Sequence, residues 1–176
     1  MLARLRDESG MGLVELTIAM FVLTFALLAL AAGYDSAAIS VHNADKKTVA
    51  AKLAASQIEL YQSLKVSLIG LDATTFASTT AADATYVSDE AALTPTGTDH
   101  TITCTDRTAV QCLPEQDVTG PENHPYRIET FIRDVQNTGA TGTWNERYVT
   151  VIVRDLGATG NPLLFSETSA FDPGPS

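Results

Sequence analysis

The stretch GMGLVELTIAMFVLTFALLALAA, from Gly10 to Ala32, decides how the rest of the chain is interpreted. From Leu16 to Ala32 no residue is charged, and extending the run back to Met11 adds one acid, Glu15. An apolar run of about 18 residues is the threshold for a membrane-spanning helix. A helix that starts at Met11 covers roughly 30 Å by Ala32, the thickness of one hydrocarbon core. The stretch therefore predicts a membrane-spanning helix.

The residues before this run indicate its orientation. Arg4 and Arg6 precede it, and basic residues beside a membrane helix favour the cytoplasmic side. The location of the run near the N-terminus, directly after these arginines, also argues against a buried helix of a soluble protein. We expect the N-terminus in the cytoplasm and the rest of the chain outside it.

A conventional signal peptide is one alternative. Its apolar region would be 16–28, and cleavage would follow Ala31, which ends an A-x-A match. Against it, Asp7 and Glu8 lie in the basic region, and Glu15 abuts the apolar region. A plain membrane anchor is another alternative, but it leaves Glu15 unexplained. A charge within the bilayer costs about 3 kcal/mol and usually marks a function, whereas at headgroup level the cost is small.

The segment GMGLVEL, residues 10–16, resembles the type III signal of type IV pilins and pseudopilins. The resemblance implies that prepilin peptidase cuts between Gly10 and Met11 and that the new Met11 amine is methylated. Glu15 then becomes the fifth mature residue, the carboxylate characteristic of the family. The sequence departs from the family at Met11, where Phe is usual, and at Gly12, where Thr or Ser is frequent.

The resemblance also implies what Glu15 does. In a filament, the Met11 amine of one subunit meets Glu15 of its neighbour, which gives the buried carboxylate the partner it needs. The implied partners are prepilin peptidase, other pilin or pseudopilin subunits, and the inner membrane before assembly. The implied location is a cytoplasmic (inner) membrane and then an extracellular pilus or a periplasmic pseudopilus.

The chain after the membrane run predicts a continued helix over 34–69. A one-sided apolar stripe repeats at steps of three and four residues, at Ala51, Ala54, Ile58, Tyr61, Leu64 and Leu68. Gly33 interrupts the pattern and is expected to loosen the helix. From Gly70 to Gly120, Thr, Ala, Ser and Asp dominate without lasting periodicity, so we expect a long loop with short strand pieces such as 100–104.

The last third predicts three strands, at 126–135, 147–154 and 163–168, separated by turns rich in Gly, Asn and Asp. Such a meander needs one face covered, and the apolar stripe of the helix is available for it. The expected fold class is α+β, a long N-terminal helix packed on a small antiparallel sheet. The expected segments are a leader (1–10), a membrane and assembly helix (11–33), its amphipathic continuation (34–69), and an extracytoplasmic loop and sheet domain (70–176).

Few residues suggest chemistry. Cys104 and Cys112, the only cysteines, predict a disulfide in an exported domain, with two free thiols as the alternative. The three histidines form no metal or catalytic motif, so we expect no enzyme activity, cofactor or metal site. Candidate calcium ligands are Asp155, Glu115 and Asp117, although their spacing fits no EF-hand. Trp144 is expected either to be an exposed contact residue or to fold back on the sheet.

The net charge of −10 argues against nucleic acid as a direct partner. The combined interpretation is a structural subunit, a minor pilin of a type IV pilus or related filament. Two alternatives stay open: a minor pseudopilin of a type II secretion or DNA-uptake system, and a secreted binding domain cleaved after Ala31.

Overall fold

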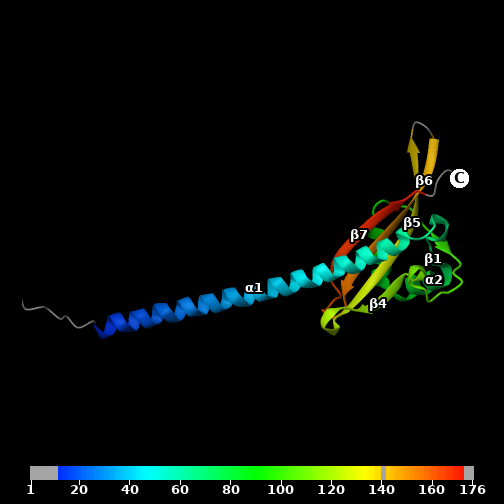
Figure 1. Ribbon diagram of the computed structural model, residues 1–176. Coiled ribbons are helices and arrows are strands. Elements are labelled where there is room, and N and C mark those ends of the chain that lie inside the picture. Colours follow the sequence, from blue (N-terminus) through cyan, green and yellow to red (C-terminus); the bar gives the residue numbers. More distant parts are fainter. Residues whose placement is uncertain (1–11, 140–141, 173–176) are drawn as a thin grey trace, which may run out of the picture. The chain divides into compact units, whose positions relative to one another are not determined.

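The computed structural model describes residues 12–139 and 142–172. The chain divides into two units, Met1–Ala44 and Asp45–Ser176, and helix α1 (Leu13–Gln62) contributes to both (Figure 1). The helix begins where the carbonyl of Gly12 accepts the amides of Glu15 and Leu16, at 2.7 and 3.3 Å.

Helix α1 ends at Gln62, so the continuation expected over 34–69 is corrected to a shorter helix. Lys65 takes an extended conformation (φ −68°, ψ 139°), which breaks the helix. A 3₁₀ turn, η1 (Val66–Leu68), then continues the spacing of apolar residues. A 3₁₀ turn repeats every three residues, so the sequence pattern alone did not show the break.

The second unit contains a five-stranded antiparallel sheet. Its strands are β2 (Thr98–Asp99), β4 (Glu115–Thr119), β5 (Pro125–Gly139), β6 (Gly142–Asp155) and β7 (Leu163–Phe171). The order is β2-β5-β6-β7, with β4 also paired to β5. The expected meander is confirmed in β5, β6 and β7, whose ranges contain all three predicted strands.

One face of the sheet packs on the C-terminal part of α1, which confirms the α+β architecture (Figure 1). The helix contributes Ala50, Ala54, Ile58 and Tyr61, all at most 3% exposed. Side chains alternate along a strand, so β6 presents Val149, Val151 and Val153 to the helix. Fully burying one such Val or Ile contributes about 1.5–3 kcal/mol.

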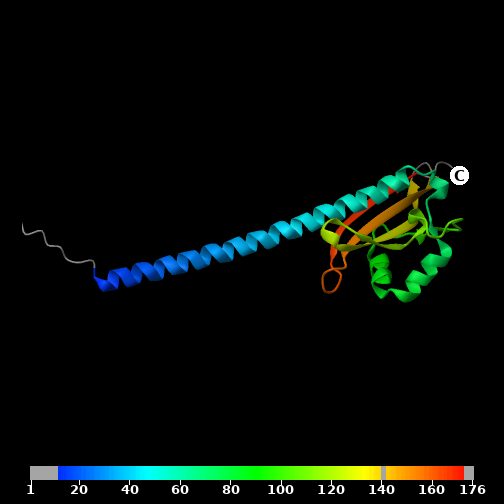
Figure 2. The ribbon, with the colours of Figure 1, turned by 60° about the horizontal axis from the view of Figure 1, so that its bottom comes forward.

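The expectation of a loop over 70–120 is wrong in its first part. This region holds two helices, α2 (Ala73–Ala82) and α3 (Ala84–Ala92), on the other side of the sheet from α1 (Figure 2). Each begins at an aspartate whose carboxylate accepts two main-chain amides, Asp72 for α2 and Asp83 for α3. Tyr86 of α3 is fully buried there against Phe131 of β5.

The remaining elements are short. Strand β1 (Leu71–Asp72) pairs in parallel with β3 (Thr101–Ile102), inside the segment where a short strand was expected. The 3₁₀ turns η2 (Val110–Cys112) and η3 (Pro121–Asn123) flank β4.

Candidate functional site: the apolar half of helix α1

The N-terminal part of α1 exposes apolar side chains on all sides. Every described residue from 12 to 44 is exposed, and large hydrophobic residues such as Leu13, Phe21 and Leu30 are 81%, 67% and 72% accessible. A helix that is apolar all round is stable only inside a membrane or among other helices. By length and composition, α1 is long enough and apolar enough to cross a membrane.

The threonines of this run do not need an external partner. The hydroxyl of Thr17 donates to the carbonyls of Leu13 and Val14, at 3.0 and 2.8 Å, and Thr24 donates to Met20 at 2.7 Å. Hydroxyls satisfied in this way are compatible with a hydrocarbon environment.

Glu15 differs from these threonines. It lies exposed in the first turn of α1, where the helix dipole favours a negative charge. Among residues 12–139 and 142–172, no side chain or main-chain group pairs with its carboxylate. Gly10 and Met11, the expected cut site, and Arg4 and Arg6 lie outside the described residues.

The expected disulfide is confirmed. Cys104 and Cys112 are bonded and are 9% and 5% exposed. The loop that they close is fixed at both ends, because Tyr61 Oη of α1 donates to Gln111 O at 3.0 Å and Cys104 N donates to Asp72 Oδ2 at 3.2 Å.

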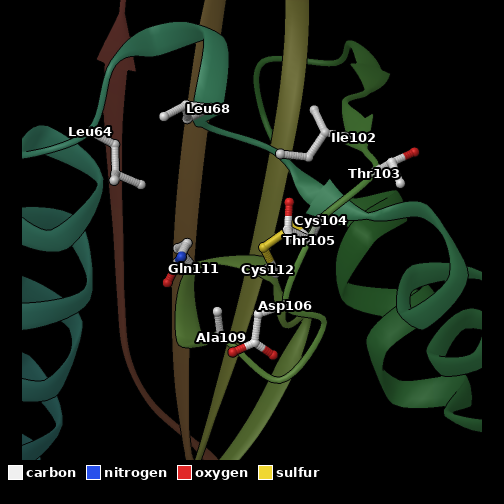
Figure 3. A pocket seen from close by; sticks show the side chains of 10 residues that line it. All are labelled: Leu64, Leu68, Ile102, Thr103, Cys104, Thr105, Asp106, Ala109, Gln111 and Cys112. Atoms are coloured by element: carbon white, nitrogen blue, oxygen red, sulfur yellow. A yellow bond between two sulfur atoms is a disulfide. The ribbon is translucent and has the colours of Figure 1, made fainter.

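A pocket of about 290 Å³ lies beside this disulfide (Figure 3). Leu64, Leu68 and Ile102 line it together with the disulfide loop. Its one charged lining side chain, Asp106, accepts from the amide and hydroxyl of Thr108, at 2.9 and 2.6 Å. These hydrogen bonds lower the pKa of Asp106, which suits an ionised turn residue and not a proton donor.

Two of the histidines hydrogen-bond to aspartates of the sheet that lie 31 and 34 positions away in the sequence. His124 Nε2 lies 2.5 Å from Asp155 Oδ1, and His100 Nδ1 lies 2.7 Å from Asp134 Oδ2. Arg147 also holds Asp134, through Nε at 2.8 Å, and donates to Val66 O at 2.8 Å. These contacts tie η1 and the segments that carry His100 and His124 to strands β5 and β6.

The three candidate calcium ligands do not form a metal site in the described part of the chain. Asp155 pairs with Lys46 of α1, whereas Glu115 and Asp117 belong to β4. Within the described part of the chain, no three His, Cys, Asp or Glu side chains are placed to hold a metal ion.

Of the two arrangements expected for Trp144, the structure shows the exposed one. It is 45% exposed, and its Nε1 lies 3.4 Å from Glu146 Oε1. Glu146 also accepts from Asn137 and Tyr148, at 2.9 and 2.7 Å, so these side chains fix one another at the end of the β5–β6 hairpin.

The sequence reasoning missed a charged layer between α3 and the sheet. Strand β5 alternates apolar residues with Arg127, Glu129 and Arg133, a pattern that usually marks a solvent-facing side. Here Glu129 is 1% and Arg133 9% exposed, because α3 covers them. The short α3 sequence carried the only signal, an Asp83 cap followed by Asp89 and Glu90.

No protein-family model, curated protein or solved structure matched the chain in the comparisons made.

Proposed function

We propose that the chain is a structural subunit, a minor pilin, of a type IV pilus or related filament, with its N-terminal helix as the assembly element. The observation that carries this proposal is the contrast within α1. Residues 13–33 expose apolar side chains on every side around one acid, Glu15, and the last part of the helix packs into the core of an α+β unit.

The proposed role of each part follows from its chemistry. The apolar part resides in the membrane and then packs among the corresponding helices of other subunits, because both environments bury it. Prepilin peptidase cuts after Gly10, and the amine of Met11 pairs with Glu15 of a neighbour. The disulfide-bonded unit remains outside the cytoplasm, where oxidising conditions keep Cys104 and Cys112 bonded.

The N-terminus of the mature chain tests this proposal. The full chain is produced in cells with an active prepilin peptidase and, in parallel, with a peptidase inactivated at its catalytic residues. We expect mass spectrometry to find a chain that starts at methylated Met11 in the first case and an uncut chain in the second. A chain that starts at Ala32 in both cases would identify a secreted domain and overturn the proposal.

The role of Glu15 is tested separately. Glu15→Ala is expected to leave cleavage intact and to reduce recovery of the subunit in sheared filaments, because the neighbour's amine loses its partner. Asp35→Ala, which removes the other acid of the exposed part of α1, is the matched control and should assemble normally. Equal incorporation of both variants would remove Glu15 from the mechanism.

A minor pseudopilin of a type II secretion or DNA-uptake system is the alternative within the same superfamily. It requires the same cut and the same Glu15. Cell fractionation distinguishes the two. A pilus subunit is recovered with sheared surface pili, whereas a pseudopilin is retained in the periplasmic fraction.

A further inference from the structure

Helix α3 is held on the second face of the sheet by charges as well as by apolar contacts. Its one buried ring, Tyr86, stacks on Phe131 with ring centroids 4.4 Å apart and donates to Thr130 O at 2.8 Å. Around this contact lie three arginines of the sheet and seven carboxylates. They are Arg127, Arg133 and Arg154, and Asp83, Asp89, Glu90, Asp99, Glu115, Asp117 and Glu129.

The first cluster is centred on Arg133 of β5. Its Nε lies 3.4 Å from Asp99 Oδ1 of β2, and its Nη2 lies 3.9 Å from Glu90 Oε1 of α3 and donates to the carbonyl of Glu90. One arginine therefore faces two carboxyl groups. Burial and then the adjacent Asp99 raise the pKa of Glu90 to about 7, although Arg133 opposes the shift.

The second cluster is centred on Arg154 of β6. Its Nε donates to Glu129 Oε2 of β5 at 3.2 Å, and its Nη2 pairs with Asp89 of α3. Again one arginine serves two carboxyl groups. Burial raises the pKa of Glu129 to about 7, against the lowering effect of Arg154 and with a contribution from Asp89.

The third cluster repeats the arrangement at the start of α3. Arg127 of β5 lies 3.1 Å from Asp83 Oδ2 and 2.9 Å from Asp117 Oδ1 of β4. Glu115 lies directly opposite Glu129 across the β4–β5 ladder, and one of its buried oxygens has no hydrogen-bond partner among the residues that the structure describes. Burial raises the pKa of Glu115, Arg127 opposes the shift, and Asp83 adds to it.

We propose that α3 is a proton-dependent clasp. In mildly acidic surroundings, protons held by Glu90 and Glu129 let α3 close over the sheet, and their loss towards neutral pH leaves excess negative charge that loosens it. The geometry supports this because α3 supplies one carboxylate to each cluster, at Asp83, Asp89 and Glu90, and each cluster has a single arginine. Opening would uncover Phe131 and Ile152, the apolar residues under Tyr86.

The direction follows from proton linkage. A carboxyl group with a pKa near 7 when closed and near 4.5 when open binds protons more tightly in the closed state. Closure is therefore strongest at the acidic end of this interval and weakens as pH rises through it. For each linked proton, the opening constant rises by up to about tenfold per pH unit and levels off above about pH 7.

Amide hydrogen exchange of the full chain in detergent micelles, measured by mass spectrometry at several values between pH 5 and pH 8, tests the clasp. Exchange is normalised to the unfolded chain at each pH, and peptides over 83–92 report on α3. We expect protection of α3 to fall as pH rises to 7, while peptides over 45–62 keep theirs. The proposal is overturned if protection of α3 does not change with pH, or if protection of residues 45–62 falls by the same amount.

Substitutions identify the groups. Glu90→Gln and Glu129→Gln imitate the protonated forms, so each is expected to reduce the pH slope of α3 opening, and the pair to abolish it. Glu59→Gln with Glu167→Gln, on α1 and β7, is the matched control and should keep the wild-type slope. If the pH dependence of α3 opening is unchanged in both single variants, the assignment to Glu90 and Glu129 is overturned. The wild-type measurements test the clasp by themselves, so they do not depend on how well the double variant folds.

Discussion

Lys46 Nζ of α1 lies 3.0 Å from Oδ2 of Asp155, at the end of β6, and joins the helix to the sheet across 109 positions of sequence. The other oxygen of Asp155 lies 2.5 Å from His124 Nε2 and accepts the amide of Gly157 at 2.8 Å. Asp155 is only 2% exposed. A buried carboxylate with three partners fixes where the sheet meets the helix, beside the apolar contacts of Ala50 and Ala54.

The first prediction concerns this carboxylate. Asp155→Ala is expected to lower the free energy of unfolding by roughly 2–4 kcal/mol, because Lys46 and His124 lose a buried partner. Urea titration in detergent micelles measures the loss, with fluorescence of the single tryptophan, Trp144, as the probe. Asp117→Ala, which removes an exposed partner of Arg127, is the control and should cost less than about 1 kcal/mol. Equal losses in the two variants would contradict the assigned role of Asp155.

The second prediction concerns the stability of the second unit at low pH. Burial acts to raise the pKa of Asp155 and of Asp134, but hydrogen bonds from Lys46 and from Arg147, respectively, outweigh it and hold both values below the usual 3.8. A depressed carboxyl pKa contributes stability that is complete above the unfolded pKa and is lost as pH falls through the folded value.

The second unit should therefore lose stability steeply below about pH 4. Thermal unfolding of the wild type and of Asp155→Asn, followed by circular dichroism between pH 2.5 and pH 6, checks this. The variant lacks one titrating group, so its curve should be shallower. Parallel curves for the two proteins would show that Asp155 does not contribute.

The third prediction concerns the disulfide. The paired substitution Cys104→Ser, Cys112→Ser is expected to lower the free energy of unfolding by about 2.5 kcal/mol, since the open loop gains entropy in the unfolded state. The same urea titration measures it, with and without reductant. Reductant should destabilise the wild type by a similar amount and leave the variant unchanged. A reductant effect on the variant would show that the loss does not come from this bond.

The sequence was sufficient for the parts of the fold with strong periodicity. The apolar run after Glu15 fits only a helix over its whole length, and the β-branched segment 147–154 fits only a strand. The sequence therefore predicted both elements correctly. The disulfide followed from Cys104 and Cys112 being the only cysteines of a chain expected to be exported. Glu15 stands out in the sequence because it is the one charged residue between Met11 and Ala32.

Helices α2 and α3 were not predicted because neither is stable alone. With 10 and 9 residues they are too short to form in isolation, and Thr and Ser lower their intrinsic propensity. Their caps were visible, since Asp72 and Asp83 each precede the same Ala-Thr pair. The charged layer beneath α3 was missed for a related reason. Glu129 and Arg154 look solvent-facing in the strand pattern, and only the tertiary position of α3 covers them, which leaves Glu129 buried and Arg154 half-buried.

The last prediction concerns the contact between α1 and the disulfide loop. Tyr61 is fully buried, and burial raises the pKa of its phenol to about 12, so the hydroxyl remains a donor to Gln111 O across the accessible pH range. Tyr61→Phe keeps the ring and leaves that carbonyl without its donor, which should lower the free energy of unfolding by about 1 kcal/mol. Tyr34→Phe, at a position 77% exposed, is the matched control and should leave the tryptophan-monitored urea curve unchanged. Because the loop carries Cys112, the Tyr61 variant should also react faster with reductant than the control. Identical reduction rates would mean that Tyr61 does not hold the loop against the helix.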